Sequence, residues 1–348
     1  MKTKTWFASA VLSMVVSGCG VSDSTTSADE QGVADQELVA GQIDALRTWS
    51  VGVCQGAYNT DPALGPVGTC RGGTAKCTGT LVGPNLVLTA RHCVQAVDYG
   101  PGALTGANPC DATFNTSPLA PGGTHVTTSP SVYVGTPTWY EVAEVRVPSS
   151  NNMCADDLAL LVLASNVPAR EARPVGIDAN RDLARRPPAA VAVVGRGALS
   201  DQFGLDANGD WNGVWNTDQG DLSRRVQQNI PFVCASNGPS GCAVVSHEVP
   251  TTHVFPTPLN WYVIGGDSLA SGDSGSGLFD QRRFNRIGRA RRVIGVNAWT
   301  FISPTGAASP NAGVRLDGFK EFLRDGVRYA AQVGGYGGGC NVDEIDSD

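Results

Sequence analysis

The stretch Cys77–Cys93 reads CTGTLVGPNLVLTARHC and places His92 directly after an apolar run. Val, Leu and Thr between turn residues are typical of extended chain, so Thr80–Leu88 is predicted to be a strand. The chain has four histidines, and the others lie in polar, loop-like surroundings at His125, His247 and His253. A lone histidine beside a strand is more often structural than catalytic, so the role of His92 depends on the residues that accompany it.

Two further motifs accompany this histidine. The sequence DLALL begins at Asp157, and the sequence GDSG contains Ser274. Catalysis by a serine nucleophile requires a base beside the hydroxyl, a carboxylate that orients the base, and N–H donors for the oxyanion. His92, Asp157 and Ser274 are the residue types that this chemistry needs.

In this order the three motifs resemble those of the chymotrypsin/trypsin family of serine proteases, whose triad follows the chain order His, Asp, Ser. The resemblance extends roughly from Leu38 to Gln332. It implies that Ser274 is the nucleophile, His92 the general base and Asp157 the residue that orients the base. The implied activity is a serine endopeptidase that hydrolyses peptide bonds through an acyl-enzyme, with no cofactor and no metal.

The resemblance also assigns roles to residues beside the triad. It implies an oxyanion hole formed by the backbone N–H groups of Gly272 and Ser274. It further implies a disulfide bond between Cys77 and Cys93, which holds the turn that carries the base.

Activation by processing is implied as well. In the family, the aspartate at the position of Asp273 pairs with an α-amino group that is freed when a propeptide is removed. Leu38 begins the sequence LVAG, which resembles the family's mature start, and the residue before it is Glu37. Cleavage there would need a protease that accepts glutamate. The alternative is that this stretch is the first strand and is never cut.

The substrate pocket departs from the family pattern. Counting back from Ser274 places Ser268 at the base of the pocket, with Asp267 one residue earlier. Serine at the base implies an apolar or mixed pocket, whereas aspartate implies a preference for Lys or Arg. The other positions expected to bind substrate are Ala298, Trp299, Thr300 and Gly313. Ala298 replaces a serine that supports the triad aspartate, Thr300 narrows the entrance, and Gly313 leaves the far wall open.

Composition and charge fit a globular protein built from strands. The 348 residues are 41% hydrophobic and 16% charged, and 43 glycines and 21 prolines indicate many turns. Short apolar runs that predict strands occur at 80–88, 158–163, 191–194, 226–233 and 293–299. They do not alternate with helical segments as in a βαβ fold, which favours a β-barrel or a β-sandwich. The formal charge of −7 excludes the basic balance of nucleic-acid binders. We expect a monomer that acts on a protein or peptide substrate.

The family resemblance implies an all-β fold of two packed antiparallel six-stranded β-barrels with a C-terminal helix. The peptidase domain is expected over 38–332, with barrel 1 over about 38–165, barrel 2 over about 185–316 and the helix over 317–332, where apolar residues recur at helical spacing. Barrel 1 would carry His92 and Asp157, and barrel 2 would carry Ser274. Segments from about 100 to 140 and from 199 to 221 are expected to be surface insertions. Residues 333–348 predict a disordered tail.

The N-terminal segment predicts export. Residues 1–18 have the basic start and short apolar stretch of a signal peptide, and VSGC ending at Cys19 resembles the lipobox of bacterial lipoproteins, whose cysteine is lipidated. An ordinary secretory signal is the alternative. Residues 19–37 are polar and predict a flexible tether or propeptide. We expect an exported bacterial protein, either secreted or an outer-membrane lipoprotein, that contacts the membrane only through lipid at Cys19.

Ten cysteines fit an oxidising compartment. Spacing alone does not fix their connectivity. Besides the pair implied by the family, the plausible pairs are Cys54 with Cys70, Cys110 with Cys154, and Cys234 with Cys242. Cys340 is then left over.

Two charged stretches allow both a functional and a plain interpretation. The sequence DANGD at 206–210 resembles the start of a calcium loop, but Trp211 and Thr217 replace the glycine and the glutamate that such a loop needs. A solvated acidic loop is therefore preferred, and no metal is assigned. Six arginines between 282 and 292 could bind acidic substrates or anionic lipid, although a charged hairpin loop is the commoner arrangement.

Two other functions are compatible with the same motifs. One is a catalytically inactive trypsin-fold module for binding or adhesion, and the presence of all three triad residue types argues against it. The other is a serine esterase of the same mechanism, which would turn over esters but not peptides.

Overall fold

The computed structural model describes residues 41–73, 75–98, 112–115, 117–205, 211–218, 220–237, 242–246, 251–254, 260–265, 269–287, 290–300 and 311–336. The expected signal peptide and tether, together with Cys19 and Leu38, lie outside these residues, as does the chain after residue 336. Within the described part of the chain, no helix has the length and apolar character needed to cross a bilayer.

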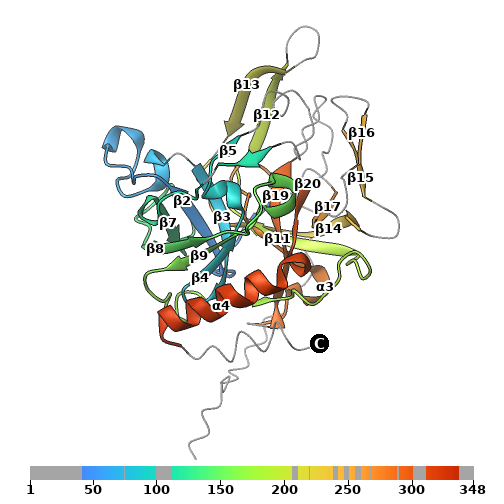
Figure 1. Cartoon of the computed structure of the whole chain (residues 1–348). Helices are drawn as coiled ribbons and strands as arrows, with labels where there is room; N and C mark the ends of the chain where they lie inside the picture. The colour runs from blue at the N-terminus through green and yellow to red at the C-terminus, as the bar shows by residue number, and fades with distance from the viewer. Residues whose placement is uncertain are drawn as a thin grey trace, which may run out of the picture. The chain divides into compact units, whose positions relative to one another are not determined.

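The first barrel is a closed ring of six antiparallel strands, coloured blue to green in Figure 1. Its order is β2-β3-β4-β9-β8-β7, and the pairing of β2 with β7 closes it. Val51, Leu81, Leu88 and Leu160 are fully buried in its core. The strands are β2 (Ser50–Gln55), β3 (Ala75–Gly83), β4 (Leu86–Thr89), β7 (Thr124–Thr127), β8 (Trp139–Arg146) and β9 (Ala159–Leu163).

The second barrel is built from a further six strands in the order β14-β11-β18-β19-β20-β17. The pairing of β14 with β17 closes it, and the two-residue strands β1 and β10 extend the sheet. Both barrels confirm the all-β class and the two six-stranded rings that the family resemblance implies. The strands of this sheet are β1 (Gln42–Ile43), β10 (Gly176–Ile177), β11 (Ala190–Gly195), β14 (Arg225–Ala235), β17 (Trp261–Ile264), β18 (Gly277–Asp280), β19 (Arg292–Thr300) and β20 (Asn311–Arg315).

Short elements connect the barrel strands. Three two-stranded sheets consist of β5 (Val97–Asp98) with β6 (Thr113–Phe114), β12 (Ser200–Leu205) with β13 (Trp211–Asp218), and β15 (Ala243–Ser246) with β16 (Thr251–Val254). The short helices are η2 (Pro62–Leu64), η3 (Cys70–Gly72), η4 (Arg91–Cys93), η6 (Pro121–Gly123), α2 (Met153–Asp156), α3 (Gln281–Phe284) and η8 (Leu316–Phe319).

Two stretches fold differently from what their sequence predicts. The apolar run Thr80–Leu88 is not one strand but two, because Pro84 and Asn85 form a turn between β3 and β4. The segment from 100 to 140 is not only an insertion, since it contains β7, which pairs with both β2 and β8. By contrast, residues 199–221 include the β12–β13 hairpin, which projects away from the barrel strands in Figure 1.

The C-terminal helix α4 (Lys320–Gly334) covers part of the first barrel. Its buried Leu323 and Val327 belong to the same core as Leu160 of β9, and Gly326 lies so close to Leu160 that a Cβ would fall 2.2 Å from the Cδ1 atom. Gly335 ends the helix in the left-handed conformation, with φ of 65°. The helix ends two residues later than the expected boundary of 332, and η8 replaces its expected first turn.

Two buried arginines link the barrels. Arg196 and Arg224 come from the second barrel, and both guanidinium groups donate to the carbonyl of Ser50 in the first, at 3.1 and 3.0 Å. Arg196 also donates to Pro130 at 2.7 Å, and Arg224 to Thr128 at 2.6 Å. Burial is the main cause that lowers the pKa of Arg224 to about 10, so the group remains charged at neutral pH.

Three disulfide bonds join cysteines that the sequence suggested as pairs. They are Cys54–Cys70, Cys77–Cys93 and Cys234–Cys242. Cys154 is also disulfide-bonded, while Cys110 and Cys340 lie outside the described residues.

Candidate active site

His92 is positioned by the turn η4, which follows β4 directly. Its Nδ1 lies 2.7 Å from Oδ2 of Asp157, and its backbone N–H donates to Oδ1 of the same carboxylate at 2.9 Å. Because a carboxylate only accepts, Nδ1 carries the proton and Nε2 is left to act as a base. Asp157 is fully buried, whereas the His92 side chain is 18% exposed.

The surroundings of His92 shift its titration. Burial on its own would lower the pKa of His92, but the charge of Asp157 and the hydrogen bond to it outweigh burial and raise the pKa above 6.5. A base with such a pKa is neutral, and so able to accept a proton, only above that value.

The turn that contains Ser274 is fastened to the first barrel by Thr78. The backbone N–H of Thr78 donates to the carbonyl of Ser274 at 2.8 Å, and its Oγ1 donates to the carbonyl of Gly272 at 2.8 Å. The same Oγ1 accepts a hydrogen bond from the backbone N–H of Arg196 at 3.0 Å. Sγ of Cys93, the neighbour of His92, lies 3.7 Å from the Ser274 carbonyl oxygen. The backbone of Ser274 therefore adjoins the turn that carries His92.

Glycine is required on both sides of Asp273 and Ser274. Gly272 and Gly275 have φ of 102° and 85°, a region that side chains disfavour. A Cβ on Gly275 would also lie 2.1 Å from the carbonyl oxygen of Thr78. Of the described residues, none accepts a hydrogen bond from the backbone N–H of Gly272 or of Ser274. These are the two donors that the family resemblance assigns to the oxyanion.

Asp273 is buried behind this turn and organises a second loop. Its carboxylate accepts hydrogen bonds from the backbone N–H of Gly197 at 2.7 Å and of Ala270 at 3.0 Å. A Cβ on Gly195 or Gly197 would lie about 2 Å from a carboxylate oxygen, at 1.9 and 2.2 Å. The predicted partner of Asp273, the α-amino group of Leu38, lies outside the described residues.

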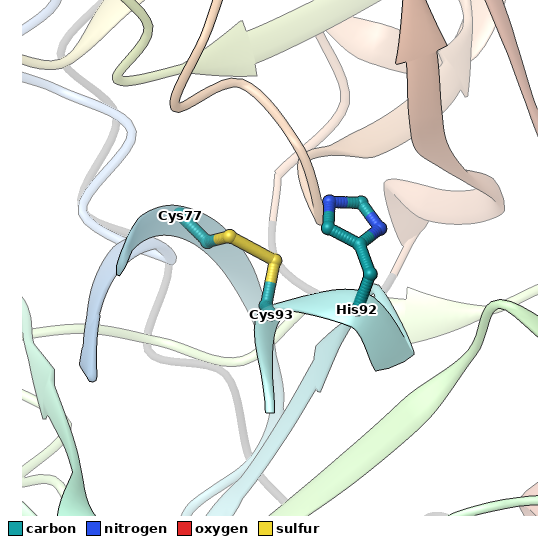
Figure 2. Close-up of side chains that lie close together, drawn as sticks. All are labelled: Cys77, His92 and Cys93. Carbon is teal, nitrogen blue, oxygen red and sulfur yellow. A yellow bond between two sulfur atoms is a disulfide. The ribbon is translucent and has the colours of Figure 1, made fainter. Parts of the chain in front are cut away.

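Cys77, His92 and Cys93 gather beside the site, as Figure 2 shows. Their ligand atoms lie within 4.8 Å of one another, which is close enough to hold a metal ion. The two sulfur atoms, however, form the Cys77–Cys93 disulfide, and metal binding by cysteine requires a thiolate. The disulfide instead ties the turn η4, which carries His92, to strand β3.

The sequence motifs do not reveal the role of Arg91, the residue before His92. Its guanidinium is buried and donates to the carbonyl of Ser150 at 2.5 Å and to Oδ1 of Asn151 at 3.2 Å. These contacts hold the loop that leads into α2 and Asp157. In the sequence Arg91 is an ordinary charged residue, and only the structure shows that it is buried.

These features can be compared with known proteins. The sequence matches the trypsin family over residues 57–268, which is more than half of the chain. The chain belongs to the trypsin family. The matched part of this trypsin-family protein contains His92 and Asp157 and ends before Ser274. No curated protein matches it significantly.

The fold of this trypsin-family protein is similar to that of a solved structure, the scabies mite inactivated protease paralogue S-I1. The two chains are 17% identical, with a TM-score of 0.50, and the alignment covers 83% of this chain and 99% of the other. The paralogue is described as inactivated, and at this identity the likeness concerns the fold alone.

Part of the predicted substrate pocket falls within the described residues. Ala298 is buried on β19, and Gly313 lies on β20. A Cβ on Gly313 would lie 2.3 Å from the hydroxyl oxygen of Tyr262, so only glycine fits at this position. Asp267 and Ser268 lie outside the described residues, and for Trp299 and Thr300 only the strand is described.

His125, on β7, is paired elsewhere on the first barrel. Its Nδ1 lies 2.8 Å from Oε2 of Glu141, whose Oε1 accepts from the hydroxyl of Tyr58 at 2.9 Å. The ring of Tyr58 also packs against His125 in a tilted arrangement, with 4.3 Å between ring centroids. The loop with Asp206–Asp210 and His247 lie outside the described residues, as does the side chain of His253.

Proposed function

We propose that this trypsin-family protein is a serine endopeptidase with Ser274 as nucleophile, His92 as general base and Asp157 as the orienting residue. The observation that carries the proposal is the 2.7 Å contact between His92 and the fully buried Asp157. It is supported by the hydrogen bonds from Thr78 that hold the Ser274 turn against the same barrel.

In the proposed reaction, Nε2 of His92 accepts the proton of the Ser274 hydroxyl as that oxygen attacks the peptide carbonyl carbon. The N–H groups of Gly272 and Ser274 bind the oxyanion that forms, and each such donor contributes about 3 kcal/mol. His92 then returns the proton to the leaving amine, and water hydrolyses the acyl-enzyme by the same route. Asp157 stays ionised and stabilises the imidazolium.

Processing and export belong to the same proposal. Cleavage before Leu38 would free an α-amino group for the buried Asp273, whose carboxylate accepts hydrogen bonds from the backbone N–H groups of Gly197 and Ala270. Three described disulfide bonds support an oxidising compartment outside the cytoplasm, either as a secreted protein or as a lipoprotein anchored at Cys19.

Labelling with a fluorophosphonate, followed by N-terminal sequencing of the labelled chain, tests the proposal. We expect wild type and Ser271→Ala, a matched serine of the same loop, to be labelled, and Ser274→Ala not to be. The labelled chain is expected to begin at Leu38. Labelling that persists in Ser274→Ala would contradict the assignment of the nucleophile.

Substrate panels separate the peptidase from its alternatives. Hydrolysis of casein and of peptide amides is expected in the wild type and lost in Ser274→Ala. Turnover of esters without peptides would support an esterase, and absence of labelling in a folded chain that begins at Leu38 would support an inactive binding module.

A further inference from the structure

A basic cavity of about 470 Å³ lies between the linker that joins the barrels and the connection from β18 to β19. Two of its arginines come from the linker and four from the connection and the start of β19. They are Arg181, Arg186, Arg282, Arg283, Arg286 and Arg292. The basic run seen in the sequence is therefore not a simple charged hairpin, because most of its described arginines face one cavity.

The charge of this cavity is opposite to that of the whole chain. Six arginines and two aspartates, Asp178 and Asp280, give its lining a formal charge of +4, whereas the chain carries −7. Like charges gathered around one volume repel one another, and an anion within that volume removes the repulsion.

The two aspartates of the cavity lining hold two of its arginines and the start of α3 in place. Asp280 forms an ion pair with Arg181 and caps α3 by accepting from the backbone N–H of Arg282 at 2.9 Å. Asp178 forms an ion pair with Arg283 at 3.1 Å. Both carboxylates are buried, with side chains 8% exposed, so neither is available to neutralise the remaining arginines.

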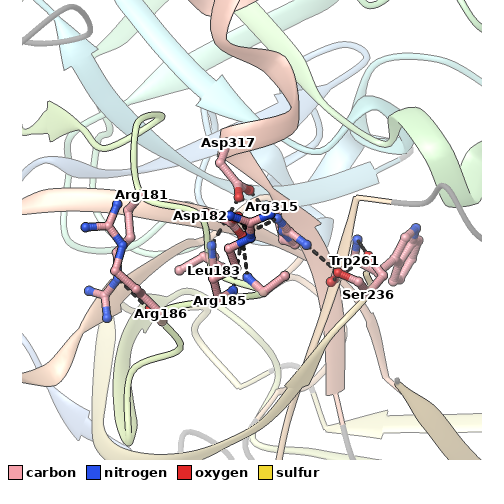
Figure 3. A network of polar contacts seen from close by, with 10 residues as sticks. Arg181, Asp182, Leu183, Arg185, Arg186, Ser236, Trp261, Arg315 and Asp317 are labelled. Atoms are coloured by element: carbon pink, nitrogen blue, oxygen red, sulfur yellow. Dashed lines mark hydrogen bonds and ion pairs between the residues drawn. The ribbon is translucent and has the colours of Figure 1, made fainter. Parts of the chain in front are cut away.

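A network of polar contacts also fixes the linker, as Figure 3 shows. Arg315, at the end of β20, forms ion pairs with Asp317 and with Asp182 of the linker, the latter at 3.5 Å. Asp317 in turn accepts from the backbone N–H of Leu183 at 3.1 Å, and Arg181 donates to the carbonyl of Arg186 at 3.0 Å. Arg181 and Arg186 are therefore carried by a segment that is already anchored.

Three of the arginines present unpaired guanidinium groups. Arg186, Arg282 and Arg286 are exposed, and none of these side chains forms an ion pair or hydrogen bond within the described part of the chain. They rise from both sides of the cavity, one from the linker and two from the connection. A ligand with a single charge would leave most of them unpaired.

We propose that this cavity binds an anion that carries two or more phosphate groups. A guanidinium donates two parallel N–H bonds to phosphate, and several of them around a concave volume match clustered phosphates rather than one carboxylate. The volume lies within the range of small-ligand sites, about 300–1,000 Å³. Such phosphates occur in soluble polyphosphates and in lipid head groups.

The phosphate site is separate from the proposed catalytic residues. Ser274 precedes β18, and α3 with its arginines follows the far end of that four-residue strand, which spans roughly 13 Å. Binding of the anion is therefore expected in Ser274→Ala as well as in the wild type, and it does not depend on the proposed peptidase activity.

Calorimetric titration of the full chain with inorganic tripolyphosphate, at constant ionic strength, tests the proposal. We expect saturable binding with one site per chain, weakened at least tenfold in Arg282→Gln/Arg286→Gln. The matched control, Arg173→Gln/Arg328→Gln, removes the same charge from exposed positions outside the cavity and is expected to bind within twofold of the wild type. An equal loss in the control would overturn the proposal.

Sedimentation with vesicles distinguishes the two sources of phosphate. Vesicles of phosphatidylcholine with cardiolipin, which carries two phosphates, are compared with vesicles of phosphatidylcholine alone. Binding of cardiolipin vesicles that is lost only in Arg282→Gln/Arg286→Gln would assign the site to a lipid head group, and binding of tripolyphosphate alone would assign it to a soluble anion. If neither probe binds saturably, the proposal is wrong.

Discussion

Thr78 is a single residue that holds both parts of the GDSG turn to the first barrel. Its backbone bonds to Ser274, and its hydroxyl bonds to Gly272 on one side and to Arg196 on the other. Because the hydroxyl contacts the backbone of the proposed oxyanion donors and not the substrate, it is a positioning residue.

Replacing Thr78 with valine keeps the shape of the side chain but removes its hydroxyl. The carbonyl of Gly272 and the backbone N–H of Arg196 then lose their hydrogen-bond partner. Each unpaired buried group costs about 1–3 kcal/mol. We expect kcat to fall about 30-fold, which corresponds to about 2 kcal/mol, with KM changed less than threefold. Thr78→Ser retains the hydroxyl and is expected to keep near wild-type kcat. Equal kcat in both variants, measured with a peptide amide, would rule out the positioning role.

The raised pKa of His92 sets the pH dependence of the proposed reaction. The neutral imidazole is the active form, so kcat/KM is expected to rise with pH and to reach half of its maximum above pH 6.5. Asp157→Asn removes the charge that raises this pKa while burial still lowers it. The midpoint should therefore shift to lower pH, and kcat should fall on the order of 10⁴-fold. A rate that does not change between about pH 5 and 9 would argue against His92 as the base.

Some residues of the candidate site can be identified from the sequence, and others only from the structure. His92, Asp157 and Ser274 stand in short motifs, so each is found from its immediate neighbours. Thr78 acts on Gly272, which lies 194 positions away in the chain. No local pattern records such a contact, because the fold alone brings the two residues together.

The strands differ in how clearly their sequences predict them. Strand β9 (Ala159–Leu163) is buried throughout and reads as a continuous apolar run. Strand β7 (Thr124–Thr127), whose sequence is THVT, lacks that signal and lies in a segment that resembles an insertion. Its place in the barrel depends on hydrogen bonds to β2 and β8, which form only in the folded protein.

Contact between α4 and β9 can be tested at Gly326. Valine at this position would overlap Cδ1 of Leu160 in a close-packed core, and we expect the free energy of unfolding to fall by about 2 kcal/mol in urea denaturation. Leu160→Ala alone is expected to cost about 2–5 kcal/mol. The double variant should lose clearly less than the sum of the two, because each change relieves the other. Strict additivity would mean that the helix does not pack there.

At the scale of the whole molecule, Arg224 joins the two barrels through carbonyl groups of Ser50 and Thr128. Arg224→Met keeps the length of the side chain but removes the donor of the buried Thr128 carbonyl and one of the two guanidinium donors of the Ser50 carbonyl, which keeps its bond from Arg196. We expect the free energy of unfolding to fall by about 3 kcal/mol, measured by urea denaturation. Arg173→Met, an exposed control, is expected to stay within about 0.5 kcal/mol of the wild type. An unchanged stability of Arg224→Met would contradict the linking role.

The family resemblance predicts the two barrels, but it does not predict the side-chain contacts that join them. Trp49, before the first barrel, packs on Phe279 of the second with ring centroids 4.6 Å apart. Arg196 and Arg224 appear in the sequence as ordinary charged residues, and their burial could not be foreseen, because arginine is rarely buried without a carboxylate partner.

Strand β1, the first described strand, pairs with β14 of the second barrel, while α4, the last element, packs on the first. Each barrel is thus completed by a segment from the opposite end of the chain. While the protein is being synthesised, the first barrel lacks its covering helix until α4 has left the ribosome. The two barrels are therefore expected not to be separable into independently soluble fragments, and the first barrel is expected to reach its final form only after α4 has been synthesised.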